Sequence, residues 1–160
     1  MAKKDYVQYI NSLLHKNTEQ SKQELFELFA DKEFRKKGML EDTRLGYMYI
    51  AICIYRAEKA AHIEENILTN VDSLGKICNL IYDMKFLLWR IEFQTESEAF
   101  TQVVNRIEEE KLSVIAVDYI IRTACFDKKN VLLKLCECYI RLNKEDIAFE
   151  MLKYGKDINR

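Results

Sequence analysis

The residues best suited to metal chemistry are Glu58 and His62, which lie four positions apart and so on one face of a predicted helix. Together with Glu65, one turn further on, they could offer two or three metal ligands. A carboxylate-bridged di-metal bundle, however, needs several carboxylates and two histidines facing inward from four helices. The only other histidine is His15, and no Glu-x-x-His motif occurs. Because charged residues such as Lys59 surround the pair, we interpret this segment as a solvated helix end and expect no metal site.

The cysteines are the second group that could do chemistry: Cys53, Cys78, Cys125, Cys136 and Cys138. Cys136 and Cys138 lie about 200° apart around a helix, so their thiols cannot bind one ion together. No basic neighbour or loop position marks any cysteine as a nucleophile, and we expect no catalytic residue. An odd number of cysteines in apolar stretches, with no apolar signal segment at the start of the chain, indicates buried, reduced thiols in a cytoplasmic protein.

Glycine and proline are scarce, since the 160-residue chain has four glycines and no proline. No glycines lie close enough together to form a phosphate-binding loop or a dinucleotide fingerprint. The 25 basic and 26 acidic side chains give a net charge of −1, which leaves no positive excess for binding duplex nucleic acid. The longest apolar stretch, 45–55, is about half the roughly 20 residues that a membrane span needs. We therefore expect no cofactor, no nucleic-acid partner and no membrane span.

Helical periodicity covers almost the whole chain and predicts an all-α protein of about eight antiparallel helices in a single domain, 1–160. Residues 1–94 contain two long central helices, and 95–160 contain shorter helix pairs, which favours a helical-hairpin stack or an orthogonal bundle. A capping-box pattern starts the second helix at Ser21, and Gly38 supplies a left-handed stop. The predicted helices are 5–16, 21–38, 41–68, 73–93, 97–111, 113–125, 128–142 and 144–157.

The third and fourth predicted helices are apolar on nearly every side, so each must be covered on more than one side. Either they form the central layer of the fold, or part of their surface meets another subunit, which would give a homodimer. Trp89 and Arg90 could anchor a partner, because these residue types dominate interface hot spots; we favour the alternative of a core tryptophan with an outward arginine. A pocket between the two helices would instead indicate ligand binding, and the residues that could line it are Tyr47, Tyr55, Tyr82 and Trp89.

Two helix pairs near the end of the chain overlay at a spacing of 32 residues. Phe100, Val103, Val104, Ile107, Ala116 and Ile120 correspond to Leu132, Leu135, Cys136, Tyr139, Ala148 and Leu152. The first four line one face of the first helix, and the alanine allows the second helix to approach closely. With Gly155, this pattern resembles the tetratricopeptide repeat over about residues 97–160. The sequence departs from that pattern at Leu132, Cys136 and Arg160, where an aromatic residue, a glycine and a proline are usual.

The resemblance implies a concave groove lined by the first helix of each pair. The matching positions are Glu98, Thr101, Asn105 and Glu108 in one repeat and Asn130, Leu133, Glu137, Ile140 and Arg141 in the next. The asparagine amides could hold the backbone of a peptide, and the glutamates would prefer a basic or neutral segment. The leading hypothesis is a non-catalytic, cytoplasmic module that binds another protein or peptide. The alternatives are an accessory or regulatory domain associated with a larger enzyme or regulator, and a small helical-bundle protein that binds a ligand.

Overall fold

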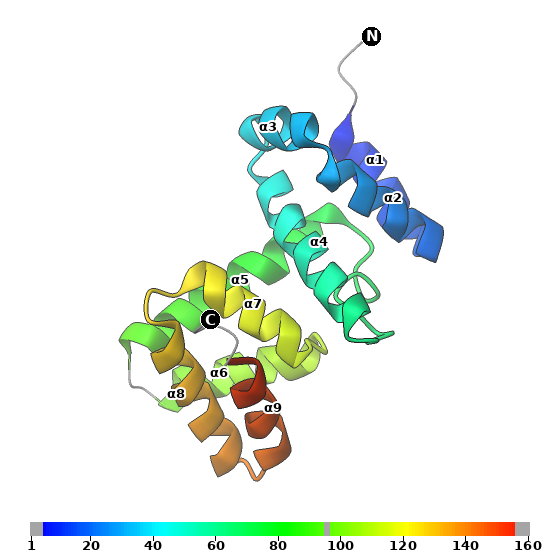
Figure 1. Cartoon of the computed structure of the whole chain (residues 1–160). Helices are drawn as coiled ribbons and strands as arrows, with labels where there is room; N and C mark the ends of the chain where they lie inside the picture. The colour runs from blue at the N-terminus through cyan, green and yellow to red at the C-terminus, as the bar shows by residue number, and fades with distance from the viewer. Residues whose placement is uncertain (1–4, 95–96, 156–160) are drawn as a thin grey trace. The chain divides into compact units, whose positions relative to one another are not determined.

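The computed structural model describes residues 5–94 and 97–155, and over these ranges the chain forms nine α-helices and no β-strand (Figure 1). The prediction of an all-α fold with about eight helices is thus confirmed. In the same ranges, no helix is long and apolar enough to cross a membrane. The helices are α1 Tyr6–Lys16, α2 Glu19–Ala30, α3 Lys32–Glu41, α4 Arg44–Ala60, α5 Leu74–Phe93, α6 Ser97–Glu109, α7 Val114–Ala124, α8 Lys128–Arg141 and α9 Glu145–Gly155.

The segment predicted as the second helix forms two helices, α2 and α3, which meet at Asp31. The extended backbone of Asp31 (φ −71°, ψ 118°) ends α2. Its carboxylate then caps α3 by accepting hydrogen bonds from two backbone N–H groups of the first turn, at 2.9 and 3.4 Å. The capping box of α2 begins at Thr18 and includes Ser21 as its third helical residue, so α2 starts earlier than predicted. Gly38 lies inside α3 without a positive φ, and it does not stop a helix.

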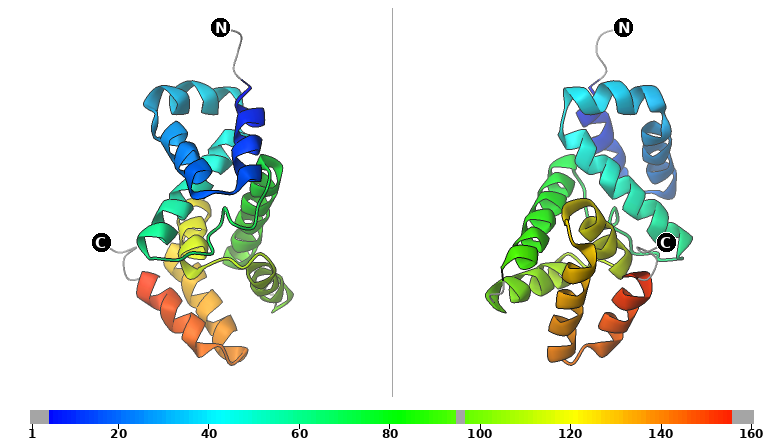
Figure 2. Two further views of the ribbon diagram at one scale, coloured as in Figure 1. Left: turned by 90° about the vertical axis from the view of Figure 1, so that its right-hand side faces the viewer. Right: turned by 60° about the vertical axis from the view of Figure 1, so that its left-hand side comes forward.

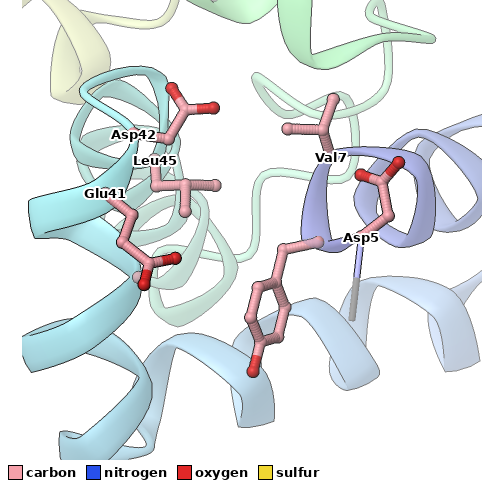
Figure 3. A pocket seen from close by; sticks show the side chains of 7 residues that line it. Asp5, Val7, Glu41, Asp42 and Leu45 are labelled. Carbon is pink, nitrogen blue, oxygen red and sulfur yellow. The ribbon is translucent and has the colours of Figure 1, made fainter. Parts of the chain in front are cut away.

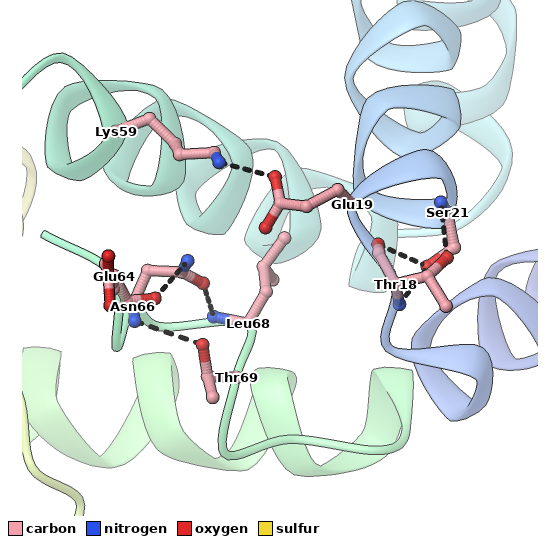
Figure 4. A network of polar contacts seen from close by, with 8 residues as sticks. All are labelled: Thr18, Glu19, Ser21, Lys59, Glu64, Asn66, Leu68 and Thr69. Carbon is pink, nitrogen blue, oxygen red and sulfur yellow. Dashed lines mark hydrogen bonds and ion pairs between the residues drawn. The ribbon is translucent and has the colours of Figure 1, made fainter. Parts of the chain in front are cut away.

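The predicted third helix is also too long, because residues 61–73 form an irregular connection after α4. The almost completely buried Glu58 carboxylate accepts a hydrogen bond from Ile67 N at 2.9 Å. Figure 4 shows Asn66 Oδ1 accepting from the backbone N–H two residues on, at 3.0 Å, and Thr69 Oγ1 accepting from Asn66 N at 3.1 Å. Side chains thus satisfy backbone groups that a continuing helix would have paired, which is why periodicity alone misplaces this helix end.

Four helices end at a non-glycine residue in the left-handed conformation: Asn17 after α1, His62 after α4, Lys111 after α6 and Asn143 after α8, with φ of 47°, 62°, 53° and 61°. After α4, α6 and α8, the following N–H donates to the carbonyl five residues earlier, at 2.9, 3.0 and 2.9 Å. This hydrogen bond is typical of a Schellman motif. The corners after α6 and α8 lie 32 residues apart, which is the spacing of the sequence repeat.

The chain folds as two compact units, Met1–Ile81 and Tyr82–Arg160, and the division falls within α5 rather than near residue 95, where the sequence pattern changes. In unit one, α1 packs against α2, and α2 and α3 pack against each other and against α4 (Figure 2). A side chain of α1 caps α5, because Leu74 N donates to Asn11 Oδ1 at 2.7 Å. The core of unit one includes Ile10, Leu13, Leu25, Phe29, Met48 and Ile54.

In unit two, α8 packs most closely against α9, and α7 packs against both. Helices α8 and α9 thus form the expected antiparallel hairpin. Helix α6 packs more closely against α8 than against α7, so α6 and α7 do not form an equivalent hairpin. The repeat positions defined above are buried, except that Phe100 and Leu152 are half-buried. The repeat pattern therefore identifies the core of unit two, although the two helix pairs pack differently.

Candidate protein-binding surface

No group of three or more His, Cys, Asp or Glu side chains in the described part of the chain could hold a metal ion. The Glu58–His62 pair does not converge on one point. Glu58 is buried and bonded to Ile67 N, whereas His62 is exposed. The prediction of a solvated helix end therefore applies to His62 and is wrong for Glu58.

All five cysteines are free thiols, and Cys78, Cys125 and Cys136 are buried while the other two are half-buried. Burial, with a smaller contribution from the Glu92 carboxylate, raises the pKa of Cys125 to about 12. Burial also raises the pKa of Cys136 to about 11. Because the thiolate is the reactive form, these two thiols stay protonated and unreactive near neutral pH.

Unit one has an open hollow of about 410 Å³ between α1 and the end of α3 (Figure 3). It is lined by Asp5, Tyr6, Val7, Gly38, Glu41, Asp42 and Leu45. Asp5 already caps α1 by accepting from Gln8 N at 3.1 Å, and Asp42 forms an ion pair with Arg44 at 2.6 Å. Since two of the three carboxylates already have structural roles, the hollow lacks the set of convergent polar groups that small-ligand sites contain.

The four residues predicted to line a ligand pocket are divided between the units. Tyr47 and Tyr55 lie on α4 in unit one, where Tyr55 is buried and Tyr47 is half-buried. Tyr82 and Trp89 lie on the part of α5 that belongs to unit two, and both are exposed. The prediction of a core tryptophan is therefore wrong, and each unit holds only one pair of the predicted set.

The predicted groove residues lie on the outer faces of α6 and α8, two helices that pack against each other. All of them are exposed except Asn130, which is half-buried. Glu108 forms an ion pair with Lys144 at the start of α9. These positions are on the surface of unit two, and the groove itself remains a prediction.

The most distinctive surface of unit two is a row of aromatic side chains along α5: Tyr82, Phe86, Trp89 and Phe93. Their spacing of four, three and four residues places them on one face of the helix. Between 45% and 59% of each residue is exposed. The opposite face of α5 carries the fully buried side chains of Met84, Leu88 and Ile91. Two apolar faces, one inside and one outside, explain why this helix is apolar on nearly every side.

A fifth aromatic residue, Phe126 in the connection between α7 and α8, extends this row. The rings of Phe93 and Phe126 are edge to face with centroids 6.3 Å apart, and Trp89 contacts Phe93 in the same way at 5.4 Å. The rings of Phe86 and Trp89 are 6.3 Å apart. Phe126 is 85% exposed in spite of its contact with Phe93. We call the surface formed by Tyr82, Phe86, Trp89, Phe93 and Phe126 the aromatic stripe.

Hydrogen bonds fix the position of Phe126 relative to α5. The buried Glu92 carboxylate accepts from Asp127 N at 2.8 Å, which attaches the residue after Phe126 to the end of α5. Lys134 Nζ donates to the backbone carbonyls of Ile91 and Glu92 at 3.0 and 3.2 Å. The stripe is therefore built on a helix and on a connection that is bonded to it.

One edge of the aromatic stripe carries an acidic and a basic side chain. Asp83 and Arg90 lie on the side of α5 next to α6, where Asp83 pairs with Arg106 at 3.2 Å and Arg90 donates to Gln102 Oε1 at 2.8 Å. Both groups are only partly buried. The stripe thus has an apolar centre and a polar border, which is the composition of protein interfaces.

The comparisons with protein families, curated proteins and solved structures give no match for this chain. The resemblance to the tetratricopeptide repeat therefore remains a prediction.

Proposed function

We propose that this chain is a non-catalytic module that binds another protein, and that it does so through the aromatic stripe of unit two. The observation that supports this proposal is the contiguous exposure of five aromatic side chains on one face. Aromatic residues are enriched in the buried centres of interfaces, and tryptophan and tyrosine are frequent hot spots. A cytoplasmic location belongs to the same proposal and is supported by the five free thiols.

The size of the stripe favours a protein partner over a small molecule. At about 150–250 Å² per aromatic side chain, the exposed parts of the five residues amount to on the order of 600 Å². This is at the upper end of the largest apolar patch on a typical monomer, about 300–600 Å². From Tyr82 to Phe93 the row spans about 16 Å along α5, or three turns, which is enough to hold an apolar helix of a partner.

Site-specific photo-crosslinking in cells that make the protein tests the proposal. A photoreactive amino acid would replace Trp89 in one variant and Phe149 in a control. Phe149 is a suitable control because it lies on α9 in the same unit, is 70% exposed and is outside the stripe. We expect a discrete protein adduct, identified by mass spectrometry, at residue 89 but not at residue 149. Equal labelling at the two positions, or no adduct at residue 89, would overturn the proposal.

The identity of the adduct also bears on the alternative function. If residue 89 captures one enzyme or transcriptional regulator, the chain acts as its accessory domain. If it captures a second copy of the chain, the stripe serves self-association.

A further inference from the structure

We infer that the protein on the aromatic stripe is a second copy of this chain, with the two α5 helices antiparallel and related by a two-fold axis. This inference rests on the proposed function, because it requires that the stripe binds a protein. It adds the identity of the partner and the register of the two helices.

The spacing along α5 allows the stripe to pair with itself. The intervals of four, three and four residues are symmetric about a point between residues 87 and 88. A two-fold axis through that point places Tyr82 opposite Phe93 of the second copy and Phe86 opposite Trp89 of the second copy. Each of the four aromatic side chains of one α5 helix therefore meets an aromatic side chain of the other, and no polar residue is brought into the centre of the interface.

The charges at the edge of the stripe fit the same arrangement. In an antiparallel face-to-face pair, equivalent edges of the two helices lie together, so Asp83 of one copy comes to the level of residue 92 of the other. Arg90 is two residues from that level, about 3 Å along the helix, and lies on the same edge. Each Asp83 thus meets an Arg90 of the second copy, and the pairing occurs twice. Lys85 lies on the other edge, where the two copies of it are about 7–8 Å apart along the axis.

The area of the stripe is also sufficient for a dimer. Two copies would bury on the order of 1,200 Å² of aromatic surface, with additional area from the polar border. Stable interfaces bury about 1,200–2,000 Å² in total. The stripe alone therefore reaches the lower end of that range.

The mass of the purified full-length chain in solution is the first test. Light scattering and sedimentation equilibrium at micromolar concentrations should give twice the mass of one chain. Trp89→Glu should raise the dissociation constant about 100-fold or more, because a hot-spot loss then occurs on both sides of the interface. Phe93→Glu should do the same, and Phe149→Glu, outside the stripe, should leave the dimer intact. Circular dichroism would establish that each variant is folded.

A single-chain mass for the wild-type protein would overturn the inference, as would a Trp89→Glu variant that dimerises as well as the Phe149→Glu control. The orientation has its own test, in which a photoreactive amino acid replaces Phe93 and the crosslinked dimer is digested. The antiparallel register predicts a crosslink to the segment around Tyr82 of the second copy. A crosslink between the two copies of residue 93 would instead indicate parallel helices and refute the register.

The variant with the photoreactive amino acid at residue 93 separates failure of this inference from failure of the proposed function. If the chain is monomeric and residue 93 captures a different, identified protein in cells, the stripe is a docking surface and self-pairing is wrong. If residue 93 gives no adduct above that of the residue 149 control, both in cells and with the purified chain, both proposals fail.

Discussion

Lys134 connects α8 to the last turn of α5, and we expect its removal to destabilise unit two. The residue is half-buried, and its ammonium group donates to the carbonyls of Ile91 and Glu92 at 3.0 and 3.2 Å. These carbonyls belong to the last turn of α5, which ends at Phe93, and helix ends are where backbone carbonyls need partners from outside the helix. The change Lys134→Met keeps most of the side-chain length but removes the charge and the donors.

Three effects determine how much stability the variant loses. Hydrogen bonds to charged groups contribute about 1.5–3 kcal/mol, and a cation at a helix C-terminus contributes about 0.3–1 kcal/mol. The ammonium group also loses part of its hydration when the chain folds, and this cost disappears in the variant. We therefore expect the free energy of unfolding to fall by about 2 kcal/mol.

Urea denaturation measures this change directly, because Trp89 is the only tryptophan of the chain and belongs to unit two. With a slope of about 2 kcal/mol per molar urea, the midpoint of the fluorescence transition should fall by about 1 M. Lys129→Met, at an exposed position of the same helix, is the matched control and should change the free energy by no more than about 0.5 kcal/mol. If both variants lost equally little stability, the bonds from Lys134 would not hold α8 to α5, and our account of how Phe126 is positioned would be wrong.

Three further predictions concern the helix caps, the thiols and the corners. Asn11→Ala should lower the free energy of unfolding by about 1 kcal/mol, whereas Asn11→Asp should preserve it, because the carboxylate keeps the acceptor at the positive end of α5; thermal melts of both variants test this. Burial raises the pKa of Cys125 from 9.0 to about 12, so the unfolded chain releases its proton first. The contribution of this thiol to the free energy of unfolding should therefore be fully present below about pH 9 and be lost as the pH rises toward 12. When urea midpoints are compared at about pH 8 and pH 10, Cys125→Ala should show a smaller decline than the wild-type chain. His62→Gly should raise the free energy of unfolding by about 0.5–1 kcal/mol, because glycine adopts the observed φ of 62° without steric cost; an unchanged or lower midpoint would contradict this.

Much of the helical framework could be predicted from the sequence, because apolar periodicity is strong and local. Helices α1 and α5 to α9 have bounds close to the predicted ones. The errors lie where one side chain makes a specific hydrogen bond. Asp31 divides a predicted helix in two. The hydrogen bond that Ile67 N donates to Glu58, nine residues earlier, holds an irregular segment where periodicity predicts a continuing helix.

The aromatic stripe could be predicted only in part. The spacing of Tyr82, Phe86, Trp89 and Phe93 is present in the sequence, but α5 carries a second apolar series on its opposite face. Periodicity cannot decide which of two apolar faces is buried, since that depends on tertiary packing, which here covers Met84, Leu88 and Ile91 and leaves the aromatic row exposed. The addition of Phe126, about thirty residues later, depends on the bond between Glu92 and Asp127 N, which no local pattern indicates.

Three of the left-handed corners, at His62, Lys111 and Asn143, have a consequence for how this chain can change over time. Each is a backbone reversal made without the residue best adapted to it, in a protein that has only four glycines. All three lie in connections, so a glycine there alters no side chain of the stripe. Glycine substitutions at these corners can therefore add stability while the stripe stays unchanged, and a chain with that added stability can tolerate a destabilising substitution in the stripe.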